Sequence, residues 1–167
     1  MRRNIKGRCS MTNEWVRAFG TMTYGIYLLT TAHDGKINGM MASWVSQISY
    51  EPPLIAVAVH KNRLSHELIE KSERFALHVL RQEQKNLVSK FMGSDPETKF
   101  SGLQWQPGQT GCPILTDCVA CFECALRTKI EPGNHTLFIG EVVDAQVVSD
   151  GRPLTTRDYR GQYIGKV

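Results

Sequence analysis

Several features that would place this chain in a familiar class of protein are missing from its sequence. No apolar stretch approaches the roughly 20 residues that a membrane-spanning helix needs, so we expect no membrane segment. The basic start, MRRNIKGRCSM, is not followed by the apolar core of a signal peptide, and we expect no export. Lys and Arg are scattered and the net charge is only +4, so nucleic acid is not an expected partner.

The common cofactor and nucleophile motifs are missing too. No G-x-G-x-x-G follows a predicted strand, no phosphate-binding P-loop is present, and no set of Ser, His and Asp stands out. HDGKING contains two glycines, but its Asp34-Gly35 pair is typical of a tight hairpin turn, which needs positive φ. We therefore expect no dinucleotide-binding fold of the Rossmann type.

Strand-forming segments dominate what is present. Helices are predicted for TNEWVRAF, SHELIEKS and QEQKNLVSKFMG, and short connections favour antiparallel pairing. Six strands in a chain of 167 residues suggest a closed or nearly closed barrel, because closure removes exposed edges. We expect one domain, residues 12–167, after a flexible extension at residues 1–11. The six predicted strands are GIYLLTTA, INGMMASWVSQISY, LIAVAVH, RFALHVL, CVACFECALRTKI and HTLFIGEVVDAQVVS.

Five cysteines raise the question of disulfides or a metal centre. An odd number cannot all pair within one chain, which favours the reducing cytoplasm. CVACFEC at first suggests an iron–sulfur cluster, but in a strand Cys118 and Cys124 would share one face, roughly 20 Å apart, with Cys121 on the other. Cys112 would also have to supply the fourth ligand from before the run, whereas ferredoxins supply it from after. We expect buried thiols and no metal.

Three segments carry residues suited to a ligand. In NGMMASW small residues interrupt a strand, which marks either the close approach of a ligand or a bulge at a barrel corner. Lys61 and Arg63 precede a helix that we expect Ser65 to cap, and cations beside a helix N-terminus favour a phosphate, although a solvated basic loop has the same pattern. His135 follows the EPGN turn, where an imidazole can contact a ring, pass a proton or simply face solvent.

Taken together and in order, a series of segments resembles the flavin reductase-like family. The resemblance runs from about Phe19 to the C-terminus, and it looks closest to flavoredoxins and to flavin reductase domains that serve rubredoxins or diiron flavoproteins. It implies a mainly β fold with inserted helices, a six-stranded antiparallel Greek-key split β-barrel, which forms a homodimer and binds FMN near the subunit interface. The segments are NGMMASWVSQISYEPPLIAVAV, SHELI, RFALHVL, FMG, GNHTLFIGEV and PLTTRDYRGQYIGK.

The resemblance also implies roles for individual residues. His135 would act near the flavin or the nicotinamide, but the family usually has Asp where this chain has Asn134, so the histidine lacks a carboxylate partner. The residues implied to bind the cofactor fall into four groups. They are Asn38, Met41, Ala42, Ser43 and Trp44 along the isoalloxazine; Lys61, Arg63 and Ser65 at the phosphate; Phe91 and Gly93 at the border of the site; and Tyr159 and Arg160 in the C-terminal motif.

Two functions remain open. One is an NAD(P)H:flavin oxidoreductase, in which FMN takes a hydride from NADH or NADPH, and the other is an electron-transfer flavoprotein that passes electrons from bound FMN to a redox protein partner. A barrel that binds FMN or haem without turnover is a third, weaker alternative. The long Gly- and Pro-rich segment at residues 94–113 could cover the flavin, which would favour the carrier. The reductase is our expectation.

Overall fold

A computed structural model describes residues 12–93 and 95–159. The predicted extension at residues 1–11 and the predicted site residue Arg160 lie outside this part of the chain. The described chain is mainly β, as expected. Its strands are β1 Tyr27–His33, β2 Lys36–Ala42, β3 Val45–Tyr50, β4 Pro53–His60, β5 Arg74–Val79, β6 Trp105–Pro107, β7 Pro113–Leu115, β8 Ala120–Ile130 and β9 His135–Val147.

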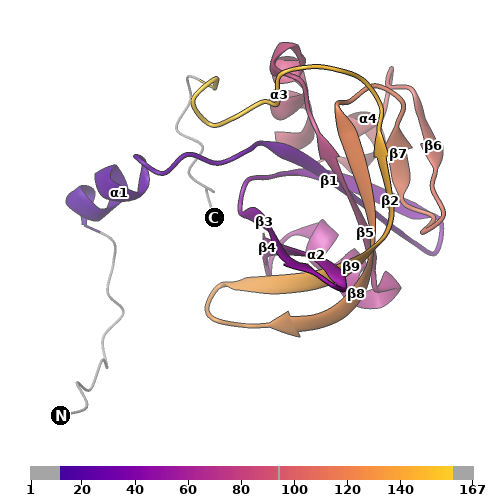
Figure 1. Cartoon of the computed structure of the whole chain (residues 1–167), viewed down its shortest axis with the longest axis horizontal. Coiled ribbons are helices and arrows are strands. Elements are labelled where there is room, and N and C mark those ends of the chain that lie inside the picture. The colour runs from indigo at the N-terminus through magenta and orange to yellow at the C-terminus, as the bar shows by residue number, and fades with distance from the viewer. Residues whose placement is uncertain (1–11, 94, 160–167) are drawn as a thin grey trace.

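Helices are fewer and short. None of those in the described chain is long and apolar enough to cross a membrane. Figure 1 shows α1 standing apart from the strands, and this helix buries none of its residues. The helices are α1 Asn13–Phe19, α2 Leu64–Ser72, the 3-10 helix η1 Gln82–Lys85, α3 Asn86–Met92 and α4 Pro96–Lys99.

The strands form one large antiparallel sheet and one small one. The large sheet has seven strands in the order β2-β1-β5-β8-β9-β4-β3, and β6 pairs only with β7. The predicted hairpin between β1 and β2 is confirmed, with φ of 48° at Asp34 and 74° at Gly35. These positive values are what a tight turn between twisted strands requires.

The predicted count of six strands is wrong, because INGMMASWVSQISY forms two strands instead of one and the part of the chain before Cys118 adds β6 and β7. β2 ends at Ala42, Ser43 and Trp44 make a connection, and β3 begins at Val45 on the opposite edge of the sheet. The small residues of NGMMASW indicated an interruption of the strand, either a ligand contact or a bulge at a barrel corner, but not a change of sheet edge. The sheet that results is open between β2 and β3, and no closed barrel forms.

This two-residue connection forces the sheet to curl. Seven flat strands would span roughly 29 Å from first to last, since neighbouring strands lie about 4.8 Å apart. Ala42 and Val45 are separated by three Cα steps, which reach at most about 11 Å. The two edge strands must therefore approach each other, and the sheet becomes a barrel split between β2 and β3 (Figure 1).

The curled sheet has a core on each face. Leu28 and Leu29 are adjacent in β1 and fully buried, yet they belong to different apolar clusters, because side chains alternate along a strand. The cluster of Leu29 includes Ile69 of α2, so α2 packs inside the curl. The cluster of Leu28 includes Phe91 of α3 and therefore lies on the outer face.

Local details differ from prediction at three places. The expected cap Ser65 is instead inside α2, which begins after Arg63, and Arg63 makes no side-chain capping bond. Gly93 ends α3 with φ of −60°, an extended conformation open to any residue. The segment predicted as a long loop at 94–113 contains α4 and β6, and its Phe100 is buried in the outer cluster.

The cysteines are buried free thiols in the described chain, as expected, but their arrangement differs from prediction. Cys118 lies before β8, and it packs with Cys112 and Cys121 in a cluster of their own. Cys124 belongs to the inner core. Cys121 and Cys124 therefore lie on opposite faces of β8, as predicted, and only Cys118 departs from the prediction because it precedes the strand.

Candidate functional site

Four of the residues predicted to bind a ligand lie in two groups near the split of the sheet, together with two residues that were not predicted. The polar half consists of Asn38 and Ser65 with Lys99, and the ring half consists of Trp44 and His135 with His60. The polar half joins the edge strand β2 to the first turn of α2 and the end of α4. The ring half joins the β2–β3 connection to the paired ends of β4 and β9, where His60 lies opposite His135.

The polar half is a buried chain of hydrogen bonds. Asn38 donates from Nδ2 to Oγ of Ser65 over 2.9 Å. Lys99 donates from Nζ to Oδ1 of Asn38 over 3.1 Å and to the carbonyl oxygen of Gly39 over 3.0 Å. That carbonyl belongs to an edge strand, where one row of backbone acceptors has no neighbouring strand to bind.

Lys99 is unusual because it is only 7% exposed and donates to two uncharged oxygens, those of Asn38 and Gly39. Burial and the positive charge of Arg63 lower its pKa, and the negative charge of Asp95 opposes them. Buried lysines are rare unless paired, because a charge loses hydration energy when it leaves water. A buried ammonium held by neutral oxygens is therefore a candidate position for an anion.

The ring half consists of three aromatic rings in contact. The ring centroids of Trp44 and His135 are 4.7 Å apart, and those of His60 and His135 are 4.9 Å apart. Trp44 is 47% exposed, so it offers a ring face to the solvent side of the site. Such a surface suits a planar ligand.

The two histidines present different atoms. The Asn62 N–H donates to Nδ1 of His60, so the proton of a neutral His60 ring is on Nε2, which is buried and has no partner in the described residues. His135 Nδ1 lies 2.8 Å from Oδ1 of Asn134, which can only accept, so Nδ1 donates and Nε2 carries a lone pair. Burial, His60 and Arg63 lower the pKa of His135 and keep it neutral.

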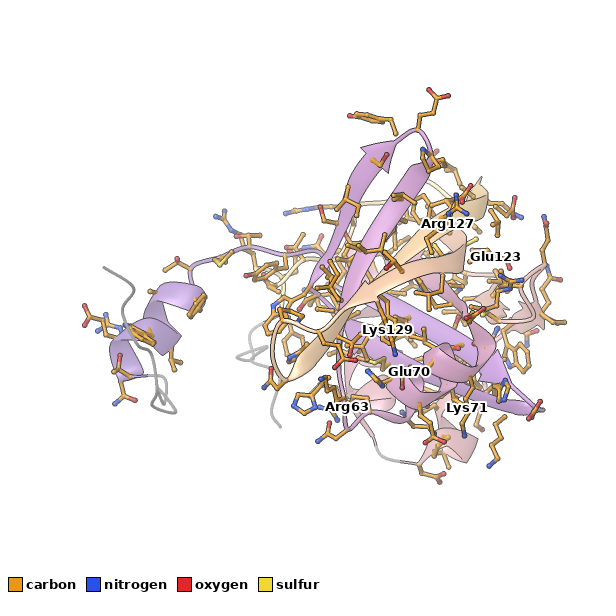
Figure 2. The ribbon with its side chains drawn as sticks, turned by 90° about the horizontal axis from the view of Figure 1, so that it is seen from below. Arg63, Glu70, Lys71, Glu123, Arg127 and Lys129 are labelled. Atoms are coloured by element: carbon orange, nitrogen blue, oxygen red, sulfur yellow. The ribbon has the colours of Figure 1, made fainter. Side chains whose placement is uncertain are left out.

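Arg63 connects the two halves electrostatically. Its positive charge lowers the pKa of Lys99 in the polar half and that of His135 in the ring half. Figure 2 shows Arg63 and Lys71 at the two ends of α2. Arg63 thus lies at the end where the first N–H groups of α2 favour negative charge.

The remaining predicted residues lie in several environments. Ser43 is 7% exposed in the connection beside Trp44, while Lys61 makes an exposed ion pair with Glu131, 2.6 Å between Nζ and Oε2. Gly93 is exposed. The others pack in the core, Met41 and Phe91 in the outer cluster, Ala42 in the inner cluster and half-buried Tyr159 against the outer cluster.

Sequence reasoning missed Lys99 and His60 as candidate site residues. Lys99 stood in a Gly- and Pro-rich segment, where a lysine normally faces solvent, and only the packing of α4 on β2 buries it. His60 ended a predicted strand, and its pairing with His135 could have been inferred only from the strand order. A lysine directly before the apolar Phe100 was the one weak signal.

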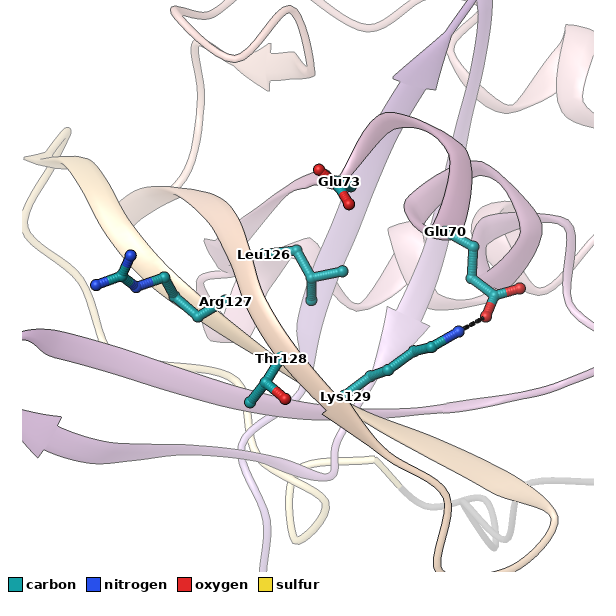
Figure 3. A pocket seen from close by; sticks show the side chains of 6 residues that line it. All are labelled: Glu70, Glu73, Leu126, Arg127, Thr128 and Lys129. Atoms are coloured by element: carbon teal, nitrogen blue, oxygen red, sulfur yellow. Dashed lines mark hydrogen bonds and ion pairs between the residues drawn. The ribbon is translucent and has the colours of Figure 1, made fainter.

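A hollow of about 320 Å³ lies between α2 and β8, lined by none of the residues of the two halves. Figure 3 shows Lys129 directed at Glu70, with which it forms an ion pair, while Arg127 points away from both. Arg127 in turn pairs with Glu141, 2.8 Å between Nε and Oε2. These cations have carboxylate partners, whereas Lys99 donates to uncharged oxygens.

The curved split sheet thus carries a buried cation in the polar half and a cluster of three rings in the ring half. The sequence of residues 19–165 matches the flavin reductase like domain family, and the chain belongs to this family. This family assignment confirms the resemblance drawn from the sequence.

Individual relatives cover most of the chain. The ferric-chelate reductase (NAD(P)H) of Archaeoglobus fulgidus is 35% identical over 155 residues, which are 90% of this chain and 92% of the relative. The high molecular weight rubredoxin of Moorella thermoacetica is 36% identical over 86% of this chain, but the match spans only 64% of that protein. The structure of nitrilotriacetate monooxygenase component B from Mycobacterium thermoresistibile has a TM-score of 0.80 at 28% identity, over 85% of this chain and 80% of that one.

Proposed function

We propose that this protein is an NAD(P)H:flavin oxidoreductase that binds FMN noncovalently at the split of the sheet. Its family makes it an oxidoreductase of the flavin reductase class. The choice of FMN and the residues that bind it are our proposal. The observation that carries it is a buried Lys99 held by neutral oxygens together with an aromatic cluster, both of which the charge of Arg63 influences.

The residues present fit such a cofactor. Ser65, Lys99, Arg63 and the first N–H groups of α2 supply donors and positive charge for a terminal phosphate. Trp44 and His135 supply ring faces for the isoalloxazine, and the buried Nε2–H of His60 supplies a donor without an acceptor. FMN, when bound, would supply the redox chemistry by accepting a hydride from NADH or NADPH, while the protein binds and orients.

His135 would serve as a neutral residue at this site. Its Nδ1–H is held by Asn134, and its lowered pKa disfavours the imidazolium form. A proton donor would need that form near neutral pH, so we assign His135 to orienting the flavin or nicotinamide ring through contact and through its Nε2 lone pair. The Asn that replaces the usual Asp is consistent with this role.

A homodimer is part of the proposal, and exposed apolar residues support it. Trp15 and Phe19 of α1 are 46% and 57% exposed, and α1 stands apart from the strands (Figure 1). Isolated helices of seven residues are marginal in water, so α1 needs a surface to pack on. Tyr50, on the edge strand β3, is 89% exposed. The free buried cysteines support the reducing cytoplasm as the compartment.

An electron-transfer flavoprotein remains the second candidate. The observation that favours it is the packing of α4, whose Lys99 closes over the polar half and would retain a bound flavin. A retained flavin would pass its electrons to a redox protein partner instead of leaving.

One experiment separates the two candidates. The purified protein is loaded with FMN, and its absorption is followed anaerobically while NADH and then NADPH are added. The reductase proposal expects the flavin absorption to bleach with one of them, and steady-state oxidation of that nucleotide to rise with added free FMN. Bound FMN that neither nucleotide bleaches would contradict the reductase and favour the carrier. A protein that binds no flavin would contradict both.

A further inference from the structure

The orientation of the Asn38 side chain is determined by its two partners. An ammonium group can only donate hydrogen bonds, so the Asn38 atom that faces Lys99 must be the oxygen. The amide nitrogen then faces Ser65 and donates to its Oγ. Ser65 is fully buried, and its own hydroxyl proton has no acceptor in the described residues. A buried donor without an acceptor is costly, and it marks a position that a ligand can complete.

We propose that Lys99 is a positioning residue for the phosphate of the flavin. By holding Oδ1 of Asn38, it fixes the direction of the Asn38–Ser65 hydrogen bond and leaves the Ser65 proton to be donated to a phosphate oxygen. This inference rests on the proposed function, and it adds a residue and a hydrogen-bond direction that neither the sequence nor the family resemblance supplied.

The charges around Lys99 support an anion at this place. Lys99 keeps two of its three protons on uncharged oxygens, those of Asn38 and Gly39. Arg63 adds a second positive charge that opposes the first. A phosphate would offset this repulsion and also accept the Ser65 proton, whereas a neutral ligand could at most accept the proton.

A purely structural role for Lys99 is the alternative. The same two hydrogen bonds attach α4 to the edge strand β2, and this attachment alone could explain why a lysine is buried there. The two roles predict different results for a variant in which Lys99 keeps its hydrogen bonds but the hydrogen bond between residue 38 and Ser65 runs in the opposite direction.

Asn38→Asp is that variant. An ionised Asp only accepts, so it would keep the hydrogen bond from Lys99 and add an ion pair to it. The Ser65 hydroxyl would then donate to this carboxylate and would no longer be available to the ligand. We expect the unfolding midpoint in urea to be kept or raised. We expect the Kd for FMN to rise about tenfold or more, because a hydrogen bond to a charged group is lost, and the Kd for riboflavin, which lacks the phosphate, to stay the same.

Further variants test whether Asn38 and Lys99 influence FMN binding through Ser65. Ser65→Ala should weaken FMN binding by a similar factor, and Asn38→Asp added to it should cause little further loss, because Asn38 acts through Ser65. Lys99→Met should weaken FMN binding, and Lys99→Arg, which keeps a donor toward Asn38, should restore part of the lost affinity.

The outcomes distinguish this inference from the proposed function. If the wild-type protein binds neither flavin, the proposed function is wrong and the inference falls with it. If the wild type prefers FMN and Asn38→Asp binds it equally well, the inference is overturned while the function stands. Equal weakening of FMN and riboflavin in the variant would also overturn it, because that result indicates general damage to the site.

Discussion

In the polar half of the site every side chain is buried, and hydrogen bonds join the three residues to one another. In the ring half Trp44 is 47% exposed, and the three residues meet through ring contacts, while the two histidines bond, among the described residues, only to Asn62 and Asn134 beside them. The difference separates two tasks of recognition. Fixed donors and a buried charge select an anionic end of a ligand, while ring faces accept any flat partner. We therefore expect changes in the polar half to alter which flavin binds, and changes in the ring half to alter how tightly every flavin binds.

The largest effect is expected from Gly39→Ala, which disturbs the backbone of the polar half. A Cβ on Gly39 would lie 2.5 Å and 2.8 Å from two ring atoms of buried Phe91. Overpacking of this kind destabilises by about 1–3 kcal/mol, and the shift of β2 would displace Asn38. The urea unfolding midpoint and FMN binding should both fall.

The matched control is Gly133→Ala, at a position with open space around the new methyl group. It should change the free energy of unfolding by no more than about 0.5 kcal/mol. Equal stability of the two variants would contradict the close packing of Phe91 on β2.

The second effect compares a fully buried histidine with the pair in the ring half. His78 Nδ1 bonds the Leu28 carbonyl oxygen, and the Leu115 N–H donates to His78 Nε2, so the buried ring is neutral. Burial lowers the pKa of His78 to about 4. Its unfolded pKa is higher, about 6.5, so the unfolded state takes the proton first and stability is lost as pH falls from about 6.5 towards 4.

We expect a loss of about 2 kcal/mol of unfolding free energy between about pH 7 and pH 5 from His78 alone. Urea titrations at both pH values measure it, with His78→Gln as the comparison and half-exposed His33→Gln as the control. The His78→Gln protein should lose less stability over this range. An identical loss in wild type and His78→Gln would show that the acid sensitivity arises elsewhere.

The third effect concerns the charge between the halves. Arg63→Gln should weaken FMN binding about tenfold, because a charged donor is removed. It should also raise the pKa of His135, since the Arg63 charge lowers it in the wild type. An NMR titration of the His135 ring measures the second effect. The control is Arg127→Gln, which removes the same charge beside the distant hollow and should change neither the FMN affinity nor the pKa of His135. If the pKa of His135 is the same in Arg63→Gln and in the wild type, the electrostatic link between the halves is refuted.

The smallest effect is expected in the ring half. Trp44→Leu removes an aromatic face worth about 0.5–1.5 kcal/mol, so FMN and riboflavin should both bind about three- to tenfold more weakly. Fluorescence titrations with the two flavins measure this, and Trp105→Leu is the control, because the Trp105 ring packs on Phe100 instead. Selective loss of FMN binding in Trp44→Leu would erase the distinction between the two halves.

Features that are determined by residues close together in the chain could be predicted from the sequence, whereas features that depend on distant segments could not. The turn at Asp34-Gly35 and the helix in TNEWVRAF depend on neighbouring residues and were predicted correctly. The change of sheet edge at Ser43-Trp44 depends on where β4 and β9 lie, so the same residues were expected to continue one strand. Ring contacts and buried charges depend on segments far apart in the chain, which is why Lys99 and His60 were missed.

The central claim is that the polar half is a phosphate site, and the affinities of the wild-type protein for FMN and riboflavin test it most directly. The two flavins share the ring system and differ by the phosphate alone. The account predicts that FMN binds at least about tenfold more tightly, since charged hydrogen bonds at Ser65, Arg63 and α2 serve only the phosphate. Equal affinities for the two flavins would contradict it.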